Sequence, residues 1–327
     1  MPTNPVAPDA LLRIIEHVNE YYEEPPPTPH RGRPRTFSGR AFLLLAVVAV
    51  VLRTFKPQEL HTLLAKDAGV RAALGFCRVP HRRTLERRLA ATLPEAEAQV
   101  QRVGQQILAE VEPKPDQPQA SAIDGRMYQA RGPLWHVRDR EQNRVPPTLR
   151  NVDTESAWSK SGYRGWVQGY RLVLQGLVFP APVPLFARWC PNSVGESTIL
   201  AQALAADQLP VTELLLGDAT FGSPDLLAAY VQRGGWLLTP QQLPVTPTSW
   251  QHDLYAYRRE TIELLFHRII QACDLKVCPT KGLARAGTFV LASVWLYQVL
   301  FLSNYRHHRP LAHIKEIIDE ARWRLAA

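Results

Sequence analysis

Two stretches of the sequence decide the fold, and both are apolar strand patterns that end on a carboxylate. The first is Ser121-Ala122-Ile123-Asp124, and the second is Leu214-Leu215-Leu216-Gly217-Asp218. In α/β sheets, functional side chains gather at the carboxyl ends of strands, where they leave the packed core and face a crevice. The two Asp residues are therefore a candidate functional pair. The alternative for each is a helix N-cap, since Asp218 precedes a short predicted turn.

Strand and helix patterns alternate around these two stretches. The strand patterns cover residues 119–123, 170–179, 183–189, 213–216 and 236–239. The helical patterns cover residues 197–206, 224–232, 257–272, 284–303 and 310–326. This order predicts an α/β fold with a mixed sheet flanked by helices.

The N-terminal part of the chain has helical patterns only, over residues 9–22, 38–53, 56–65 and 81–93. Residues 30–92 hold thirteen basic and three acidic residues, a net charge of +10, whereas the whole chain of 327 residues carries +8. Short helices of which the third is strongly basic are typical of a helix-turn-helix contact with DNA. The alternative is a solvated helix face without a partner.

Two Pro-rich stretches divide the chain, because closely spaced prolines cannot continue a helix. They are Pro25-Pro26-Pro27-Thr28-Pro29 and Pro113-Lys114-Pro115-Asp116-Gln117-Pro118. We predict an N-terminal helix with its linker at 1–29, a helical DNA-binding domain at 30–111 and a linker at 112–118. An α/β domain at 119–305 and a C-terminal helix at 306–327 complete the predicted organisation.

A third carboxylate for the Asp pair is sought in the helical pattern at 257–272. Its apolar stripe consists of Ile262, Leu265, Phe266, Ile269 and Cys273. On a helical wheel, Glu263 lies about 100° from the centre of this stripe and Glu260 about 160° from it. Glu263 therefore borders the face that packs on the sheet, whereas Glu260 faces solvent. The alternative for Glu263 is a surface ion pair with Arg259, one turn before it.

Three carboxylates at the edge of a sheet can hold two divalent ions roughly 3.5–4 Å apart, a pair that assists phosphodiester chemistry. Oxygen ligands favour Mg²⁺, with Mn²⁺ as the second possibility.

The order of several motifs resembles that of DDE transposases of bacterial insertion sequences, over about residues 30–305. These motifs are Gly-Arg-Pro-Arg at 32–35, Ile123-Asp124-Gly125, Gly162-Tyr163-Arg164-Gly165-Trp166, Leu216-Gly217-Asp218-Ala219-Thr220-Phe221, Arg259-Glu260-Thr261-Ile262-Glu263-Leu264-Leu265-Phe266 and Thr280-Lys281-Gly282. The resemblance implies a ribonuclease-H-like catalytic domain at 119–305, preceded by a small all-α DNA-binding domain. It also implies that Asp124, Asp218 and Glu263 are the catalytic residues and the ligands of two Mg²⁺ ions.

Arg259 matches the arginine of the family's signature, whereas its tyrosine falls on Ala256 and its lysine on Ile270. Only 44 residues separate Asp218 from Glu263, so a compact catalytic domain without a large β insertion is expected.

The resemblance implies an enzyme that cuts transposon ends in a metal-dependent reaction and joins them to target DNA. Its partners would be the terminal inverted repeats and the target DNA, bound by a homodimer on paired ends. The alternatives are a catalytically silent DNA-binding protein derived from a transposase and a metal-dependent nuclease.

Basic residues in three regions are expected to contact DNA. Arg31, Arg33 and Arg35 match a minor-groove arm, with a phosphate-binding linker as the alternative. The remaining predicted contacts are Arg82, Arg83, Arg87, Arg88, Lys160, Arg164, Arg259 and Lys281. Basic residues between the two Asp residues are interleaved with Trp135, Trp158, Tyr163 and Trp166. We expect this arrangement to bind the DNA backbone or a displaced strand. The alternative is a solvated loop with structural aromatic residues.

Four other carboxylates compete for a place in the site and are expected to be surface or cap residues: Asp153, Glu155, Glu196 and Asp225.

Four scattered cysteines argue against a disulfide scaffold. The apolar runs at 41–52 and 289–302 are shorter than the roughly 18–20 residues that cross a bilayer. No signal peptide is recognisable at the N-terminus. We therefore expect a cytoplasmic protein without a membrane partner.

Overall fold

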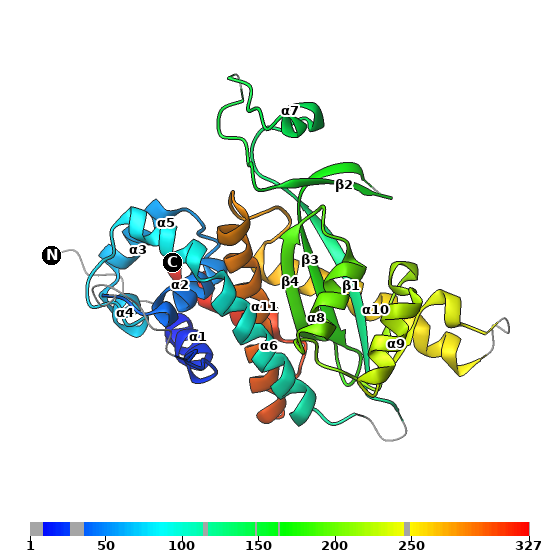
Figure 1. The fold of residues 1–327 in the computed structure, drawn as a ribbon. Helices are drawn as coiled ribbons and strands as arrows, with labels where there is room; N and C mark the ends of the chain where they lie inside the picture. Colours follow the sequence, from blue (N-terminus) through cyan, green and yellow to red (C-terminus); the bar gives the residue numbers. More distant parts are fainter. Residues whose placement is uncertain are drawn as a thin grey trace.

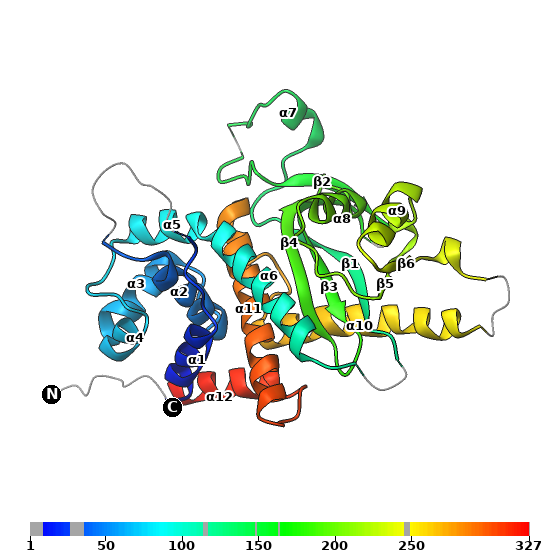
Figure 2. The ribbon, with the colours of Figure 1, turned by 60° about the horizontal axis from the view of Figure 1, so that its bottom comes forward.

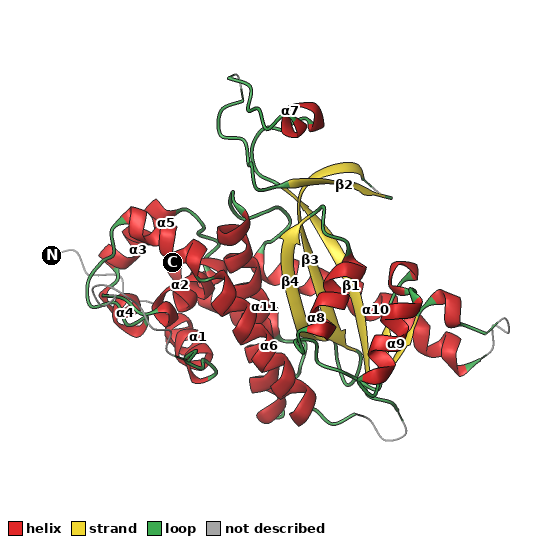
Figure 3. Ribbon diagram, in the orientation of Figure 1, coloured by secondary structure: helices red, strands yellow, loops and turns green. Residues whose placement is uncertain are grey.

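The chain folds into a mixed sheet with helices packed against it and a group of helices beside it (Figure 1). The computed structural model describes residues 9–26, 36–113, 117–147, 149–162, 164–244 and 249–326. The predicted mixed α/β class is confirmed: Figure 3 separates the strands from the helices of the N-terminal region.

Among the described residues, six helices precede the first strand. They are α1 (Asp9–Glu20), α2 (Gly39–Val51), α3 (Pro57–Lys66), α4 (Ala68–Ala73), α5 (Arg82–Ala91) and α6 (Leu93–Glu110). The sequence patterns located α1, α2, α3 and α5, whereas the short α4 and the long α6 were not predicted.

The sheet has six strands: β1 (Ala120–Gln129), β2 (Ala157–Ser161), β3 (Gly165–Leu177), β4 (Val183–Pro191), β5 (Leu214–Leu216) and β6 (Trp236–Leu238). Their order is β2-β3-β1-β5-β6, and β4 pairs with the part of β3 that β2 leaves open. β3 is antiparallel to β1, β2 and β4, whereas β5 is parallel to both β1 and β6.

Helices follow or interrupt the strands. They are α7 (Val137–Glu141), α8 (Glu196–Ala205), the 3₁₀ turn η1 (Ala219–Phe221), α9 (Pro224–Gln232), the 3₁₀ turn η2 (Pro240–Gln242), α10 (Trp250–Cys273), α11 (Leu283–Arg306) and α12 (Ile314–Ala326). Figure 2 shows α8 and α9 on one side of the sheet and α10 running across the other side.

The strand that carries Asp124 is longer than predicted. Its parallel pairing with β5 ends at Ala122 opposite Leu216. Its antiparallel pairing with β3 continues to Gln129, so Asp124 lies inside β1, opposite Leu174. The predicted strand end at Asp124 is therefore wrong for β1 as a whole, because the partner on its other side keeps the strand extended.

The helix α11 lies between the helical region and the sheet, where it contacts α2, α5, α6 and β4. It is long and apolar enough to cross a membrane by length and composition, but its apolar stretch is entirely buried inside the protein. Its buried polar groups bond to both neighbours. Thr288 donates to Leu89 O, and Gln298 Nε2 donates to Val100 O at 2.9 Å and to Pro184 O at 3.0 Å. The predicted boundary at 112–118 thus separates two segments that share one hydrophobic core, and the division into domains remains a prediction.

Candidate metal centre and nucleic-acid cleft

Asp124 and Asp218 lie side by side at the edge of the sheet. Ala122 and Leu216 form the last parallel pair of β1 and β5. Asp124 lies two residues further along β1, and Asp218 lies two residues after Leu216, beyond the end of β5. The equivalent positions inferred from the sequence are therefore adjacent in space. One carboxylate oxygen of Asp124, one of Asp218 and one of Glu196 all lie within 4.8 Å of one another.

Glu196 is the functional candidate that sequence analysis assigned to the surface or a cap, and that assignment is wrong. It is the first residue of α8, and its side chain is only 14% exposed. The signal available in the sequence was its position at the start of a predicted helix that follows a strand. The pairing of β1 with β3 and β5, which brings Asp124 and Asp218 close to the start of α8, was not available from local pattern.

A buried arginine holds Glu196 in place. Arg171 of β3 is 7% exposed, and its Nη1 lies 3.2 Å from Glu196 Oε1. Burial raises the pKa of Glu196 to about 7, while the charge of Arg171 opposes this rise and the carboxylates of Asp124 and Asp218 add to it. Charged carboxylates so close together in a half-buried site require compensating positive charge.

Asp124 has two partners besides the neighbouring carboxylates. Its Oδ1 accepts a hydrogen bond from Gly125 N at 2.7 Å, and its Oδ2 lies 3.6 Å from Arg258 Nη1. Burial is the main cause that raises the pKa of Asp124; these two partners lower it, and Asp218 and Glu263 raise it. Arg258 was also missed by sequence analysis, although the helical wheel holds the signal: it lies four residues before Ile262, on the stripe that faces the sheet.

Asp218 combines the two roles considered for it. Its Oδ1 accepts hydrogen bonds from the backbone N and the hydroxyl of Thr220 and so caps η1. The side chain remains part of the carboxylate group with Asp124 and Glu196. The cap fixes the orientation of the carboxylate at the end of β5.

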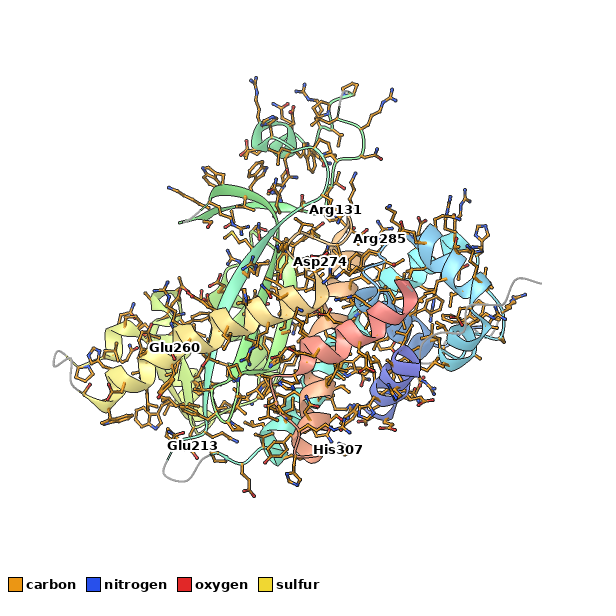
Figure 4. All side chains as sticks on the ribbon, turned by 180° about the vertical axis from the view of Figure 1, so that it is seen from behind. Arg131, Glu213, Glu260, Asp274, Arg285 and His307 are labelled. Atoms are coloured by element: carbon orange, nitrogen blue, oxygen red, sulfur yellow. The ribbon has the colours of Figure 1, made fainter. Side chains whose placement is uncertain are left out.

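Glu263 lies further out on α10. Its side chain is 62% exposed, and its Oε1 accepts a hydrogen bond from Arg259 Nε at 2.9 Å, as the surface-pair alternative predicted. It nevertheless lines the same cleft as the Asp pair. The apolar stripe of this helix is buried as predicted, and Glu260 is exposed on α10, which crosses in front of the sheet in Figure 4.

The carboxylates open into a cleft of about 1170 Å³ whose rim is basic. Two predicted DNA contacts line it: Lys160 from the end of β2 and Arg164 from the turn before β3. Lys276, which was not predicted, lines it beyond the end of α10. A negative floor beneath a positive rim suits a phosphate chain held over bound cations.

The other predicted DNA contacts lie in three places. Arg82, Arg83 and Arg87 are exposed on α5, and Arg88 is partly buried, with its guanidinium 5.1 Å from the centre of the Phe42 ring. Lys281 donates a hydrogen bond to Asn151 O at the start of α11. Arg31, Arg33 and Arg35 lie outside the described residues.

Three competing carboxylates take structural positions. Asp153, expected at the surface or as a cap, is buried and accepts hydrogen bonds from Tyr170 Oη at 2.7 Å and from Gly282 N, at the start of α11, at 3.0 Å. Glu155 is exposed and accepts a hydrogen bond from Leu283 N, and Asp225 lies in the exposed first turn of α9.

The donor set of the carboxylate group fits a hard divalent cation. All its ligand atoms are carboxylate oxygens, they converge within 4.8 Å, and the residues are half-buried at the edge of an open cleft. Such ligands suit Mg²⁺, Mn²⁺ or Ca²⁺ and disfavour the softer metals that thiolates select.

Comparison with known proteins gives a distant structural likeness. No protein-family model matches the chain, and no curated protein matches it. A solved structure of the piggyBac transposase synaptic complex with hairpin DNA is similar to it at a TM-score of 0.43 and 10% sequence identity, over 97% of this chain and 77% of that one.

Proposed function

We propose that this chain is a metal-dependent transposase that cuts DNA at transposon ends and joins the freed ends to target DNA. The observation that carries the proposal is the placement of Asp124 and Asp218. Each lies two residues beyond the last pair of adjacent parallel strands, with ligand oxygens within 4.8 Å of each other. Carboxylates at such an edge are suited to hold ions against a phosphodiester.

The sheet supports the ribonuclease-H-like assignment in the proposal. Strands β4, β3 and β1 form an antiparallel set, and β5 and β6 continue from β1 in parallel. The succession of strands and helices along the chain is the one that the resemblance to DDE transposases implies. Asp124 then lies on the first strand, and Asp218 follows the strand that pairs with it in parallel.

Asp124 and Asp218 would hold two Mg²⁺ ions, with Mn²⁺ as the substitute. When bound, such ions lower the pKa of an attacking hydroxyl or water and stabilise the leaving oxygen. The sequence assigns the third ligand to Glu263, whereas the close contact of Glu196 makes it a second candidate for that position. Glu196 stands already oriented by Arg171, and Glu263 would have to exchange its bond to Arg259 for a place nearer the Asp pair.

The remaining residues of the cleft would bind and orient the DNA. Lys160, Arg164 and Lys276 line the path that a phosphate chain follows to the carboxylates. Arg258 would form an ion pair with Asp124 and so keep that carboxylate oriented towards the cleft when DNA binds. The exposed arginines of α5 would contact the terminal repeats, and two copies of the chain on paired ends would complete the synaptic complex.

The test incubates the protein in Mg²⁺ with two substrates taken from the DNA that flanks the gene: an intact end, which reports cleavage, and a pre-cleaved end, which reports strand transfer. Asp124→Asn and Asp218→Asn should each abolish cleavage and transfer while leaving the binding of the end within about twofold of wild type. Full activity in either variant would refute the site. Glu260→Gln, on the exposed side of the same helix as Glu263, is the matched control and should remain active.

The same assay separates the competing functions. Transfer supports a transposase, cleavage without transfer supports a nuclease, and binding alone supports a silent DNA-binding protein. Glu196→Gln and Glu263→Gln decide the third ligand: the residue whose loss abolishes transfer belongs to the metal site, and the other is dispensable for chemistry.

A further inference from the structure

An arm of the chain projects from the sheet between β1 and β2. It spans residues 130–156, carries the short helix α7, and stands clear of the helices that cover the sheet (Figures 1 and 2). The elements that begin at its base, β2 and β3, form a hairpin whose turn lines the carboxylate cleft.

Large apolar side chains are exposed on the arm and the adjacent hairpin. Trp166, at the start of β3, is 66% exposed, and Leu134, Val137 and Val145 of the arm are also exposed. A pocket of about 470 Å³ lies where the two meet, and its lining consists of Val137, Arg140, Glu141, Trp158 and Trp166. We call it the tryptophan pocket. An exposed apolar group of this kind marks a binding surface in a soluble domain.

The pocket is held in shape by hydrogen bonds that leave its aromatic faces open. Trp158 Nε1 donates to Trp135 O at 2.6 Å, and the Trp135 ring is buried with its Nε1 donating to Arg144 O at 3.0 Å. Trp135 N also donates to Gln168 Oε1 of β3. The arm is therefore fastened to the hairpin at its base, and no rearrangement is needed to present Trp158 and Trp166.

The charge around the pocket is positive. Residues 130–166 hold seven basic and four acidic side chains, a net charge of +3. The basic ones are Arg131, Arg138, Arg140, Arg144, Arg150, Lys160 and Arg164. An aromatic face beside cationic side chains is the combination that binds single-stranded nucleic acid, because bases stack on the rings while the backbone meets the charges.

The hairpin connects this pocket to the carboxylate cleft. Lys160 lies directly opposite Trp166 in the pairing of β2 with β3, and Lys160 lines the cleft. A DNA strand that runs from the carboxylates past Lys160 therefore reaches Trp166 within the distance that separates two paired β-strands.

We propose that the tryptophan pocket holds an unpaired base of the DNA next to the cleavage position, stacked on Trp166. The proposal rests on the proposed function to the extent that DNA is the partner. It adds to that function a binding site for a single base that has left the double helix. The net positive charge favours a DNA strand over a second copy of this basic chain as the occupant.

The test compares two DNA probes: a blunt duplex of the end sequence and the same duplex with an unpaired 2-aminopurine overhang, whose fluorescence is quenched by stacking. Trp166→Ala should weaken binding of the overhang probe about fivefold or more, since each aromatic–base stack contributes about 1–3 kcal/mol, and should remove the quenching. Its binding of the blunt duplex should stay within about twofold of wild type. Trp166→Phe keeps a ring and should retain most of the quenching.

The matched control is Trp236→Ala, since Trp236 is 70% exposed but lies on β6 at the opposite edge of the sheet. Equal weakening of both probes by Trp166→Ala, or unchanged quenching, would overturn the proposal. Loss of self-association by Trp166→Ala in sedimentation, with unchanged binding of the overhang, would identify a second copy as the occupant and would also overturn it. If wild type binds neither probe, the proposed function fails instead.

Discussion

Replacement of Gly104 by alanine should force the helix α6 away from the strand β4 and so destabilise the contact between the helical region and the sheet. Gly104 lies in the buried face of α6, where a Cβ atom would be 1.8 Å from Leu185 O and 2.6 Å from Leu185 C of β4. Both are backbone atoms of β4, which is paired with β3, so neither can turn away as a side chain could. The Cβ–O distance must lengthen from 1.8 Å to more than 3.0 Å, which requires α6 and β4 to move apart.

The loss of unfolding free energy can be worked out from the interactions between α6 and β4. Overpacking a well-packed contact costs about 1–3 kcal/mol. Separation also strains the amide of Gln298, which donates both to Val100 O of α6 and to Pro184 O of β4. One weakened buried hydrogen bond adds about 1–3 kcal/mol, and the higher helix propensity of alanine returns about 1 kcal/mol. We expect a net loss of about 1–5 kcal/mol.

Urea unfolding followed by far-UV circular dichroism measures this loss. Gly69→Ala is the matched control, because Gly69 is exposed in α4 and its Cβ would meet only the Asp67 side chain, at 3.3 Å. That variant should be neutral or gain up to about 1 kcal/mol. A Gly104→Ala protein as stable as wild type, or one stabilised like the control, would refute the close approach of α6 to β4.

Three further predictions concern polar contacts. Arg171→Met leaves Glu196 without its buried partner and should lower the free energy of unfolding by about 3–5 kcal/mol in urea; a loss below about 1 kcal/mol would contradict the buried pair. Tyr255→Phe removes the hydrogen bond to the carbonyl that follows β5 and should cost about 0.5–1.5 kcal/mol by the same measurement, with a neutral result counting against that bond. Burial raises the pKa of Glu95 above its ordinary value of 4.5, so the folded protein holds this proton more tightly than the unfolded chain, and the associated stability is lost as pH rises through the folded pKa. Glu95→Gln keeps an acceptor for Tyr22, so its stability relative to wild type should increase between pH 4.5 and pH 7.5; an unchanged difference would show that Glu95 ionises freely.

Most of the sheet could be predicted from sequence because its signals are local. Runs such as Leu214-Leu215-Leu216 are apolar on both faces, as buried parallel strands are, and the structure places β5 there. β2 and α7 were missed because the segment that carries them has no sustained period and projects from the core, so no hydrophobic face was needed to specify it.

The candidate site was predictable in part for the same reason. Asp124 and Asp218 could be paired from sequence since each follows an apolar strand. Glu196 could not, because its place beside them depends on the pairing of β1 with β3 and β5. Glu263 shows the opposite case: the helical wheel put it on the correct border, but only the structure shows that it is engaged by Arg259 and stands outside the closest group of carboxylates.

By itself the sequence determined the succession of helices and strands, the apolar stripe of α10 and the two carboxylates at equivalent strand positions, because periodicity and strand ends are properties of neighbouring residues. The tertiary structure alone decided which further side chains meet them. Arg171, Glu196 and Arg258 come from three different elements, and their contacts arise from strand register and helix packing, which join residues far apart in the chain.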